Sequence, residues 1–213
     1  MITRTLLREW GACWFDDDVE LDGDARISEV APGRSSMSPR EITQIDDVSL
    51  DDRLWVACRS LHHRSEDLAW AFSIDEAAAV SHLAGCPDDQ ATHRRLVDRI
   101  RQIWSRSDPD DADADLARVS IDVKRRIDRS DMARWSNFAW RSCLFASKPS
   151  GATWITARSA ALSVAASREE DMPYEARITA IDAELRRAIE RALVALGEDA
   201  DGWSDHADPV TGR

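Results

Sequence analysis

The sequence predicts an all-α protein, folded as a single-domain bundle of about eight or nine helices joined by short turns. Three observations lead to this prediction. Glycine and proline are scarce, at 8 and 7 of 213 residues, whereas Ala and Arg are abundant and runs of Val, Ile and Thr are short. Helix start and stop signals recur along the whole chain. No pair of strands with a hairpin turn is visible, so we expect helices packed as a bundle or as stacked helical hairpins.

Two serines offer N-caps for helices in the first third of the chain. Ser38 is followed by Pro39 at the first helical position and by Glu41 three residues after the cap, which is the pattern of a capping box. Ser49 repeats this arrangement with Asp52 in the last role. We therefore expect a helix to begin directly after each of the two serines.

The remaining helices are predicted from the spacing of apolar residues and from residues that start or end a helix. Asp108-Pro109, Ser130 and Pro173 mark three starts, while Gly85 and Gly197 mark two ends. Besides the two capped helices, we expect seven more, at residues 3–15, 66–85, 88–106, 109–127, 131–147, 152–167 and 173–196.

We therefore predict one all-helical domain at residues 1–197. In this prediction residues 16–37 form an acidic irregular loop, and residues 198–213 form a flexible acidic tail. The chain has no apolar run long enough for a membrane span and no signal-peptide core at its N-terminus. Its four cysteines have no paired spacing, and we expect them to be reduced core thiols of a cytoplasmic protein: Cys13, Cys58, Cys86 and Cys143.

The formal net charge is -12 and is distributed unevenly. Residues 1–52 hold thirteen Asp and Glu against five Arg, and further acidic blocks lie at 108–115 and 198–208. Basic residues collect between these blocks, at 94–106 and 124–129. Because phosphate contacts need a positive face, the excess of acidic residues disfavours direct binding to nucleic acid. The basic middle helices keep nucleic-acid binding an open alternative.

The acidic stretch WFDDDVELDGDARISE, residues 14–29, has carboxylates at alternate positions, as a calcium-binding loop does. In one register Ala25 stands where such a loop has a hydrophobic residue, and Pro32-Gly33 shortens the helix that should follow. In a second register Ala25 replaces the turn glycine and Ala31 replaces the last carboxylate. Neither register is complete, so we expect a solvated acidic loop and no metal. Weak calcium binding by residues 18–29 stays an open alternative.

A zinc site is suggested by His82, Cys86 and His93, because side chains four residues apart on a helix can bind one ion. However, Gly85 ends the helix between the first two, and no fourth ligand lies at a suitable spacing. We expect a buried thiol and ordinary surface histidines instead. The sequence also has no nucleophile elbow, HExxH or GxGxxG motif, and KPSG at 148–151 does not have the form of a phosphate loop. We therefore predict no catalytic residue and no cofactor.

Nine tryptophans are an unusual number for this length. We expect most of them to pack in the core, because they lie on helical stripes beside Ala and Leu, where large and small side chains interdigitate. This prediction covers Trp104, Trp135, Trp140 and Trp154. Trp14 and Trp203 are flanked by acidic residues and are candidates for exposed anchors that a partner could bind.

Several stretches resemble the Ala/Trp-rich all-helical proteins of bacteria and their phages, some of which are described as immunity proteins. They follow one another over most of the chain, at residues 37–59, 68–80, 88–104 and 131–167. The most specific of them is the Pro-capped helix that leads into DRLW, Asp52 to Trp55. The chain departs from the family where SKPSG, residues 147–151, interrupts the Ala-Ala-Trp pattern. The resemblance implies an all-α fold and a role in host–phage or toxin conflict, and it brings no catalytic residues.

The resemblance and the acidic N-terminal third lead to one functional hypothesis. We expect a stoichiometric protein-binding inhibitor of the immunity or anti-defence kind, comparable to an anti-CRISPR protein. An acidic face would block a basic groove on a nuclease, toxin or nucleoprotein effector and would gain association rate from electrostatic steering. The expected binding face consists of six acidic residues and one apolar anchor: Asp16, Asp17, Asp18, Glu20, Asp22, Asp24 and Trp14.

Two other function classes stay open. The protein could be a structural or assembly protein that self-associates into a homo-oligomer through Ala/Trp helical stripes. An enzyme is the third class, but only scattered carboxylates would support it, and we do not expect catalysis. A membrane partner is not expected either.

Overall fold

The computed structural model of the protein describes residues 1–12, 28, 31–105, 109–128, 132–148, 152–168 and 172–197, with only the backbone described at 109–111. Its architecture confirms the predicted all-α fold. The described residues contain nine α-helices and one 3-10 turn, η2 (Ser81–Leu83). The helices are α1 (Arg4–Glu9), α3 (Pro39–Thr43), α4 (Leu50–Arg64), α5 (Glu66–Ala79), α6 (Pro87–Trp104), α7 (Pro109–Ile127), α8 (Arg134–Ala146), α9 (Thr153–Ala166) and α10 (Tyr174–Ala195).

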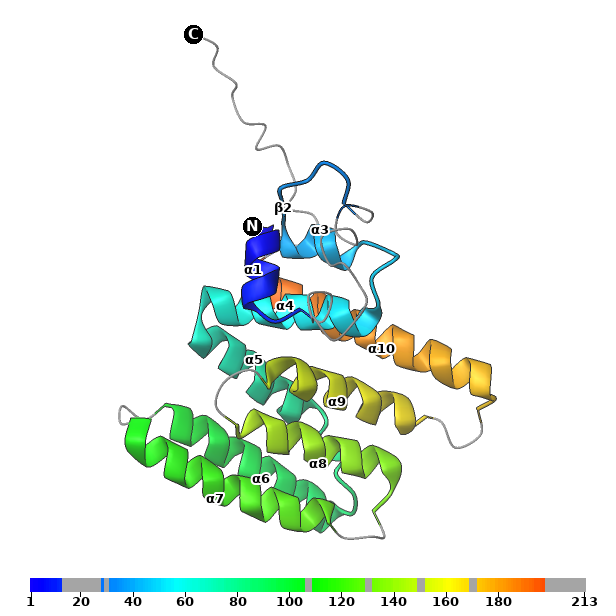
Figure 1. The fold of residues 1–213 in the computed structure, drawn as a ribbon. Helices are drawn as coiled ribbons and strands as arrows, with labels where there is room; N and C mark the ends of the chain where they lie inside the picture. Colours follow the sequence, from blue (N-terminus) through cyan, green and yellow to red (C-terminus); the bar gives the residue numbers. More distant parts are fainter. Residues whose placement is uncertain are drawn as a thin grey trace.

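The long helices lie in a stack, which Figure 1 shows from the side. At one end, α4 packs against α10 and carries the short helices α1 and α3. In the middle, α9 packs against α10, α4, α5 and α8. At the opposite end, α6 and α7 pack against each other and against α8. Each long helix thus packs against at least one neighbour in the stack, as in other helical bundles.

Both predicted caps are present. The hydroxyl of Ser38 accepts a hydrogen bond from the Glu41 amide at 3.1 Å, and the Glu41 carboxylate accepts one from the Ser38 amide at 2.8 Å. The hydroxyl of Ser49 accepts from the Asp52 amide at 3.1 Å and donates to the Asp52 carboxylate at 2.7 Å. Such a cap contributes about 1 kcal/mol to stability and fixes where the helix begins.

Three helix boundaries differ from the predicted ones. The first helix ends at Glu9 and not at residue 15, and Gly11 follows with a positive φ of 71°. The Ala-rich helix α5 ends at Ala79, and the chain then forms η2 before Gly85 turns it with φ 115°. Helix α8 begins at Arg134 with Ala133 in the cap position, so the predicted start at Ser130 is wrong.

A short strand pair was not predicted from the sequence. Ile2–Thr3 (β1) pairs antiparallel with Ser36–Met37 (β2), with Ile2 opposite Met37. The pairing joins segments more than thirty residues apart in the chain, so no hairpin signal marks it. It holds the N-terminus next to α3, with which Ile2 shares a small apolar cluster.

The interior is divided into two large apolar clusters that meet at α5 and α9. The lower core consists of the buried residues of α5 to α8 that surround Trp140. The upper core consists of the buried residues of α4, α5, α9 and α10 that surround Leu193. Both residues have no exposed surface. Trp140 therefore confirms the predicted core role of tryptophan. Trp104, Trp135 and Trp154 are only partly buried.

None of the helices in the described residues is both long enough and apolar enough to span a membrane. The predicted tail at 198–213 and most of the predicted loop at 16–37 lie outside the described residues. Within that loop the structure describes residues 28 and 31–37, and the latter contain β2.

Candidate functional site

The predicted acidic binding face lies outside the part of the chain that the structure describes. This applies to every residue proposed for it: Trp14, Asp16, Asp17, Asp18, Glu20, Asp22 and Asp24. It also applies to the candidate calcium loop at 18–29, apart from Ser28, and to Trp203. The segment nevertheless has a fixed starting point. The last described residue before it is Ala12, which is 7% exposed and packs in the N-terminal apolar cluster.

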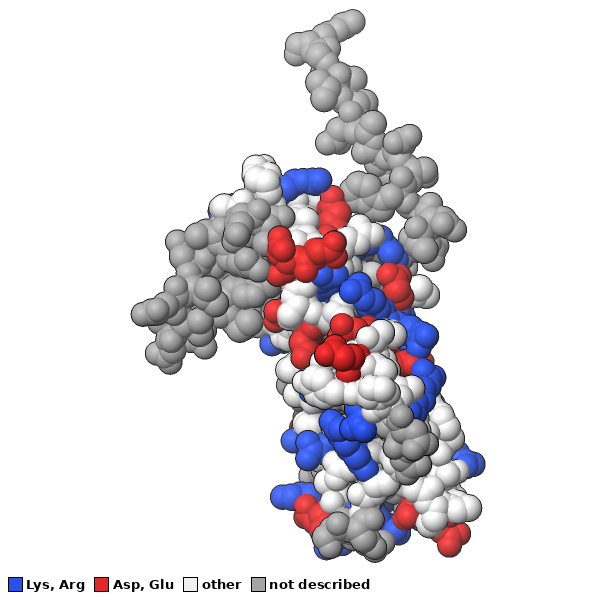
Figure 2. Space-filling model, turned by 90° about the vertical axis from the view of Figure 1, so that its right-hand side faces the viewer, with Lys and Arg blue, Asp and Glu red and all other residues white. Residues whose placement is uncertain are grey.

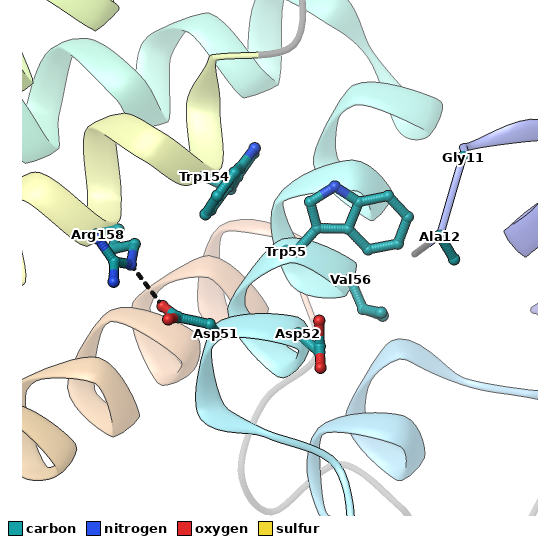
Figure 3. Close-up of a pocket in the computed structure, with 8 residues that line it drawn as sticks. All are labelled: Gly11, Ala12, Asp51, Asp52, Trp55, Val56, Trp154 and Arg158. Carbon is teal, nitrogen blue, oxygen red and sulfur yellow. Dashed lines mark hydrogen bonds and ion pairs between the residues drawn. The ribbon is translucent and has the colours of Figure 1, made fainter. Parts of the chain in front are cut away.

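A pocket opens beside this starting point. It lies between Gly11-Ala12, the first half of α4 and the first half of α9, and it has a volume of about 310 Å³. Figure 3 shows the indole of Trp55 between that of Trp154 and the Gly11-Ala12 segment. The lining residues are Gly11, Ala12, Asp51, Asp52, Trp55, Val56, Trp154 and Arg158.

Two helices each contribute an aromatic and a charged residue to the pocket. On α4, Asp51 lies four residues before Trp55, and on α9 Trp154 lies four residues before Arg158. Residues four apart on a helix share one face, so both pairs point into the pocket. The two charged residues meet there, with Arg158 Nε 2.7 Å from Asp51 Oδ1. Both side chains keep more than a third of their surface exposed, so this ion pair lies at the pocket mouth.

The Trp55 side chain also contacts Trp10 and Arg59. Trp10 contacts it edge-on at 6.2 Å between ring centroids, and the Arg59 guanidinium lies 5.6 Å from the Trp55 ring. Arg59 also donates a hydrogen bond to the Trp10 carbonyl at 3.3 Å. These contacts join the N-terminal segment to α4.

A local cluster of carboxylates lies beside the pocket. Two of its members just precede α4 and two lie in the first turn of that helix: Asp46, Asp47, Asp51 and Asp52. Asp46 is 96% exposed and lies 3.5 Å from the guanidinium of Arg53, which is buried and donates to the Val48 carbonyl at 2.7 Å. Figure 2, which views the right-hand side of Figure 1, shows acidic side chains mainly in its upper half and basic ones mainly along its right edge and below.

Sequence reasoning found only parts of this pocket. Asp52 was predicted to cap a helix, which the structure confirms. Trp154 was predicted to pack in the core, but it is only partly buried and also lines the pocket. Sequence reasoning did not assign a role to Trp55 or Arg158. The spacing of four residues between a charged residue and a tryptophan on each helix was the available signal. The pairing of the two helices came only from the fold.

The prediction for His93 and Cys86 is wrong in both parts. His93 is fully buried, whereas Cys86 is exposed at the start of α6. His93 lies on the inward face of α6, where its ring nitrogens find partners in the Ser81 hydroxyl at 2.9 Å and the Ala139 carbonyl at 3.0 Å. Burial lowers the pKa of His93 to about 4. These partners replace the water that a surface histidine would bind.

The described residues contain no group of three His, Cys, Asp or Glu side chains that could hold a metal ion. Among the thiols, burial raises the pKa of Cys143 to about 12, and burial together with nearby Glu76 raises the pKa of Cys58. Hydrogen bonds to Glu76 raise the pKa of Arg191. This last pair joins α5 to α10, with distances of 2.6 and 2.8 Å between guanidinium and carboxylate.

Comparisons of the chain with family models, with curated proteins and with solved structures found no match. What the pocket can bind is therefore inferred from its own side chains. Two indole faces attract cations by about 0.5–2 kcal/mol each, and adjacent carboxylates add charge-assisted hydrogen bonds. The pocket thus has the chemistry to receive an arginine or lysine side chain.

Proposed function

We propose that the protein is a non-enzymatic cytoplasmic binding protein of the immunity or anti-defence kind, which inhibits a partner protein by covering a basic surface on it. The observation that carries the proposal is the pocket between α4 and α9, with its two tryptophans and the carboxylates at the start of α4. A pocket of this kind can hold one basic side chain of the partner as an anchor.

The internal Arg158 supports this assignment. Its guanidinium lies in the pocket, pairs with Asp51 and comes from the same helix face as Trp154. The pocket therefore already accommodates a guanidinium beside a carboxylate. A partner's arginine can bind in the same way, in the place of Arg158 on Asp51.

The acidic N-terminal third extends the site beyond the pocket. From Ala12 the chain continues into Trp14 and the six acidic residues at 16–24. A basic side chain anchored in the pocket would therefore bring the surrounding partner surface close to this segment. Clustered charge of one sign accelerates association with a basic surface, and salt weakens the effect.

Self-assembly through Ala/Trp stripes is the second candidate, and the burial of the alanines favours it less. The alanines of α9 are buried against neighbouring helices, with Ala157, Ala160, Ala161 and Ala165 at most 2% exposed. Trp140, on the facing helix α8, has no exposed surface. These side chains already have partners within the described fold, so they offer little surface to a second copy.

A capture experiment tests the proposal. The full-length protein is immobilised, challenged with a cell lysate at low and at high salt, and any captured protein is assayed for activity while the free protein is added. We expect a protein that is captured only at low salt and loses its activity at a one-to-one ratio. Capture should be lost when the six acidic residues at 16–24 are changed to Asn or Gln.

The matched control changes six exposed acidic residues elsewhere: Asp67, Asp75, Asp98, Asp113, Asp122 and Glu175. This variant has the same net charge as the first, so it should still capture the partner if the position of the charge matters. Equal loss with both variants, or capture that high salt leaves unchanged, would contradict an acidic binding face. Capture without loss of the partner's activity would contradict inhibition.

A further inference from the structure

A groove at the other end of the stack contains both lysines of the chain. The sequence has only two lysines, Lys124 on α7 and Lys148 just after α8. Both line a groove of about 410 Å³ between these helices, together with Arg141. Residues 118–148 hold eight Lys and Arg against three Asp, a local net charge of +5 in a chain whose total is -12. The groove is therefore opposite in charge to the pocket at α4.

The groove cations differ from the neighbouring arginines. On α7, Arg118, Arg125 and Arg126 each lie within 3.4 Å of an aspartate. In contrast, no carboxylate of the described residues lies within ion-pair distance of Lys124, Arg141 or Lys148. Arg141 donates instead to the neutral Asn137 side chain at 2.8 Å. The groove lining also includes one carboxylate, that of Asp128, which leaves an excess of two positive charges. None of the three exposed cations has an ion-pair partner within the described fold.

The floor of the groove is apolar. Ile121 is 51% exposed there, and Leu144 and Phe145 are partly buried beside it. The ammonium of Lys148 lies 5.4 Å from the Phe145 ring. An apolar floor with a cationic rim fits a peptide that carries an aromatic or aliphatic side chain between carboxylates. A sugar-phosphate backbone would satisfy the rim only, and it would be repelled by the net charge of the whole chain.

The chain itself contains such a peptide. Residues 198–208, EDADGWSDHAD, have five carboxylates around Trp203 and contain no Lys or Arg. We propose that the α7/α8 groove binds the C-terminal segment, residues 198–213, of a second copy of this protein. Trp203 would lie on the apolar floor, and the flanking carboxylates would pair with Lys124, Arg141 and Lys148.

A second copy fits better than the same chain. The C-terminal segment follows α10, which packs against α4 and α9, while the groove lies on α7 and α8 at the opposite end of the stack (Figure 1). Within one chain, Trp203 is only six residues beyond Gly197 and can reach about 20 Å, whereas α9, α8 and α7 follow α10 at about 8–10 Å per helix layer. Each molecule offers one groove and one segment, so two copies can exchange them reciprocally.

The two lysines also supply the test. Reductive methylation with isotope-labelled formaldehyde keeps their positive charge and labels Lys124, Lys148 and the N-terminal amine, so the 213-residue chain gives only three labelled sites. Lys124→Arg and Lys148→Arg assign the signals. We expect both lysine signals to shift as protein concentration rises, and the N-terminal signal to stay unchanged. The shifts should disappear near 1 M salt, where the Debye length is about 3 Å.

The matched variants are also full-length. One changes Glu198, Asp199, Asp201, Asp205 and Asp208 to Gln or Asn, and the other changes five acidic residues of the N-terminal segment: Asp16, Asp17, Asp18, Glu20 and Asp22. Only the first should abolish the shifts, and a synthetic peptide of residues 198–213 should restore them. By light scattering, Lys124→Glu with Lys148→Glu should prevent the association that Lys124→Arg with Lys148→Arg retains.

Three results would overturn the proposal. Lysine signals that are the same in the wild type and the C-terminal variant would show an empty groove. Shifts that do not depend on protein concentration would place the segment of the same chain there. Shifts lost equally in both acidic variants would show a response to net charge alone.

Discussion

The pocket at the α4 end and the groove at the α7/α8 end carry opposite net charge in their linings and differ in their apolar surfaces. At the α4 end, the pocket has indole walls, and its one internal cation, Arg158, already pairs with a carboxylate. At the α7/α8 end, the groove has an aliphatic and aromatic floor, and its three cations have no acidic partner among the described residues. The first surface suits a basic ligand and the second an acidic one. An overall net charge of -12 therefore does not tell which partners each end can bind.

The cores beneath these surfaces differ as well. The lower core contains Trp140 and, next to it, His93, at 5.0 Å between ring centroids, with the polar atoms of both hydrogen-bonded to carbonyl or hydroxyl groups. The upper core consists mainly of Ala and Leu. Two buried carboxylates lie at this end: Glu76, which pairs with Arg191, and Glu184, which pairs with Arg168 and Arg187. We therefore expect substitutions in the cores mainly to lower the free energy of unfolding and substitutions in the pocket mainly to weaken binding.

Trp140→Ala should have the largest effect on stability. Trp140 has no exposed surface, and its Nε1 donates to the Ala84 carbonyl at 2.9 Å, so the substitution leaves both a cavity and an unpaired carbonyl. We expect a loss of about 3–5 kcal/mol in the free energy of unfolding, measured by urea denaturation. Trp154→Ala at the pocket should cost about 1 kcal/mol. Equal losses would contradict the contrast between a core and a pocket tryptophan.

The pH dependence of stability should come next in size. His93 is neutral in the fold because its pKa is lowered to about 4, whereas in the unfolded chain it is near 6.5. A histidine with a lowered pKa stabilises the fold fully above pH 6.5 and loses this contribution as the pH falls toward 4. The free energy of unfolding should fall by about 3 kcal/mol over this range. Thermal or urea unfolding of the wild type and of His93→Gln between pH 7 and pH 4 checks this. Parallel pH profiles would exclude His93 as the cause.

Glu76→Gln tests one buried charge of the upper end. The Glu76 side chain is 4% exposed, while Arg191 is 46% exposed and can return to water when its partner is lost. We therefore expect a loss of about 1–2 kcal/mol, less than for a fully buried pair. Asp122→Asn, which breaks an exposed ion pair with Arg125, serves as the control and should change stability by less than about 0.5 kcal/mol. If Glu76→Gln lowered the free energy of unfolding by no more than Asp122→Asn does, the Glu76–Arg191 pair would not hold α5 to α10.

Asp51→Asn should have the smallest effect on stability. Both members of its ion pair with Arg158 are more than 40% exposed, and such pairs contribute little. We expect a change below about 0.5 kcal/mol in the free energy of unfolding, whereas binding of a basic ligand in the pocket should weaken clearly. A large stability loss would mean that the pocket residues hold the fold together and are not a binding surface.

The sequence predicted the local parts of this structure better than the parts that depend on packing. The capping signals of Ser38 and Ser49 act through neighbours three residues away, so they could be predicted without the fold. The burial of His93 depends on the Ala139 carbonyl of another helix, and the β1–β2 pair depends on segments far apart in the chain. Such contacts leave no periodic signal.

The candidate sites show the same limit. Acidic residues at the start of α4 are visible in the sequence, but their meeting with Trp154 and Arg158 requires α9 to pack across α4. The two lysines are visible as a count, yet their position in one groove follows from the packing of α7 on α8. The sequence indicated that charge matters, and the fold shows which charged residues lie together.

We propose that the α4/α9 pocket and the carboxylates at the start of α4 bind a basic partner surface. Calorimetric titration of the full-length protein with an arginine-rich peptide that contains one tryptophan tests it most directly. Four variants form two matched pairs: Asp51→Asn with Asp122→Asn, whose carboxylates are 44% and 48% exposed, and Trp154→Ala with Trp135→Ala, both partly buried tryptophans. We predict that the pocket variant in each pair weakens binding about fivefold or more while its control does not. Equal affinities within both pairs would contradict the claim.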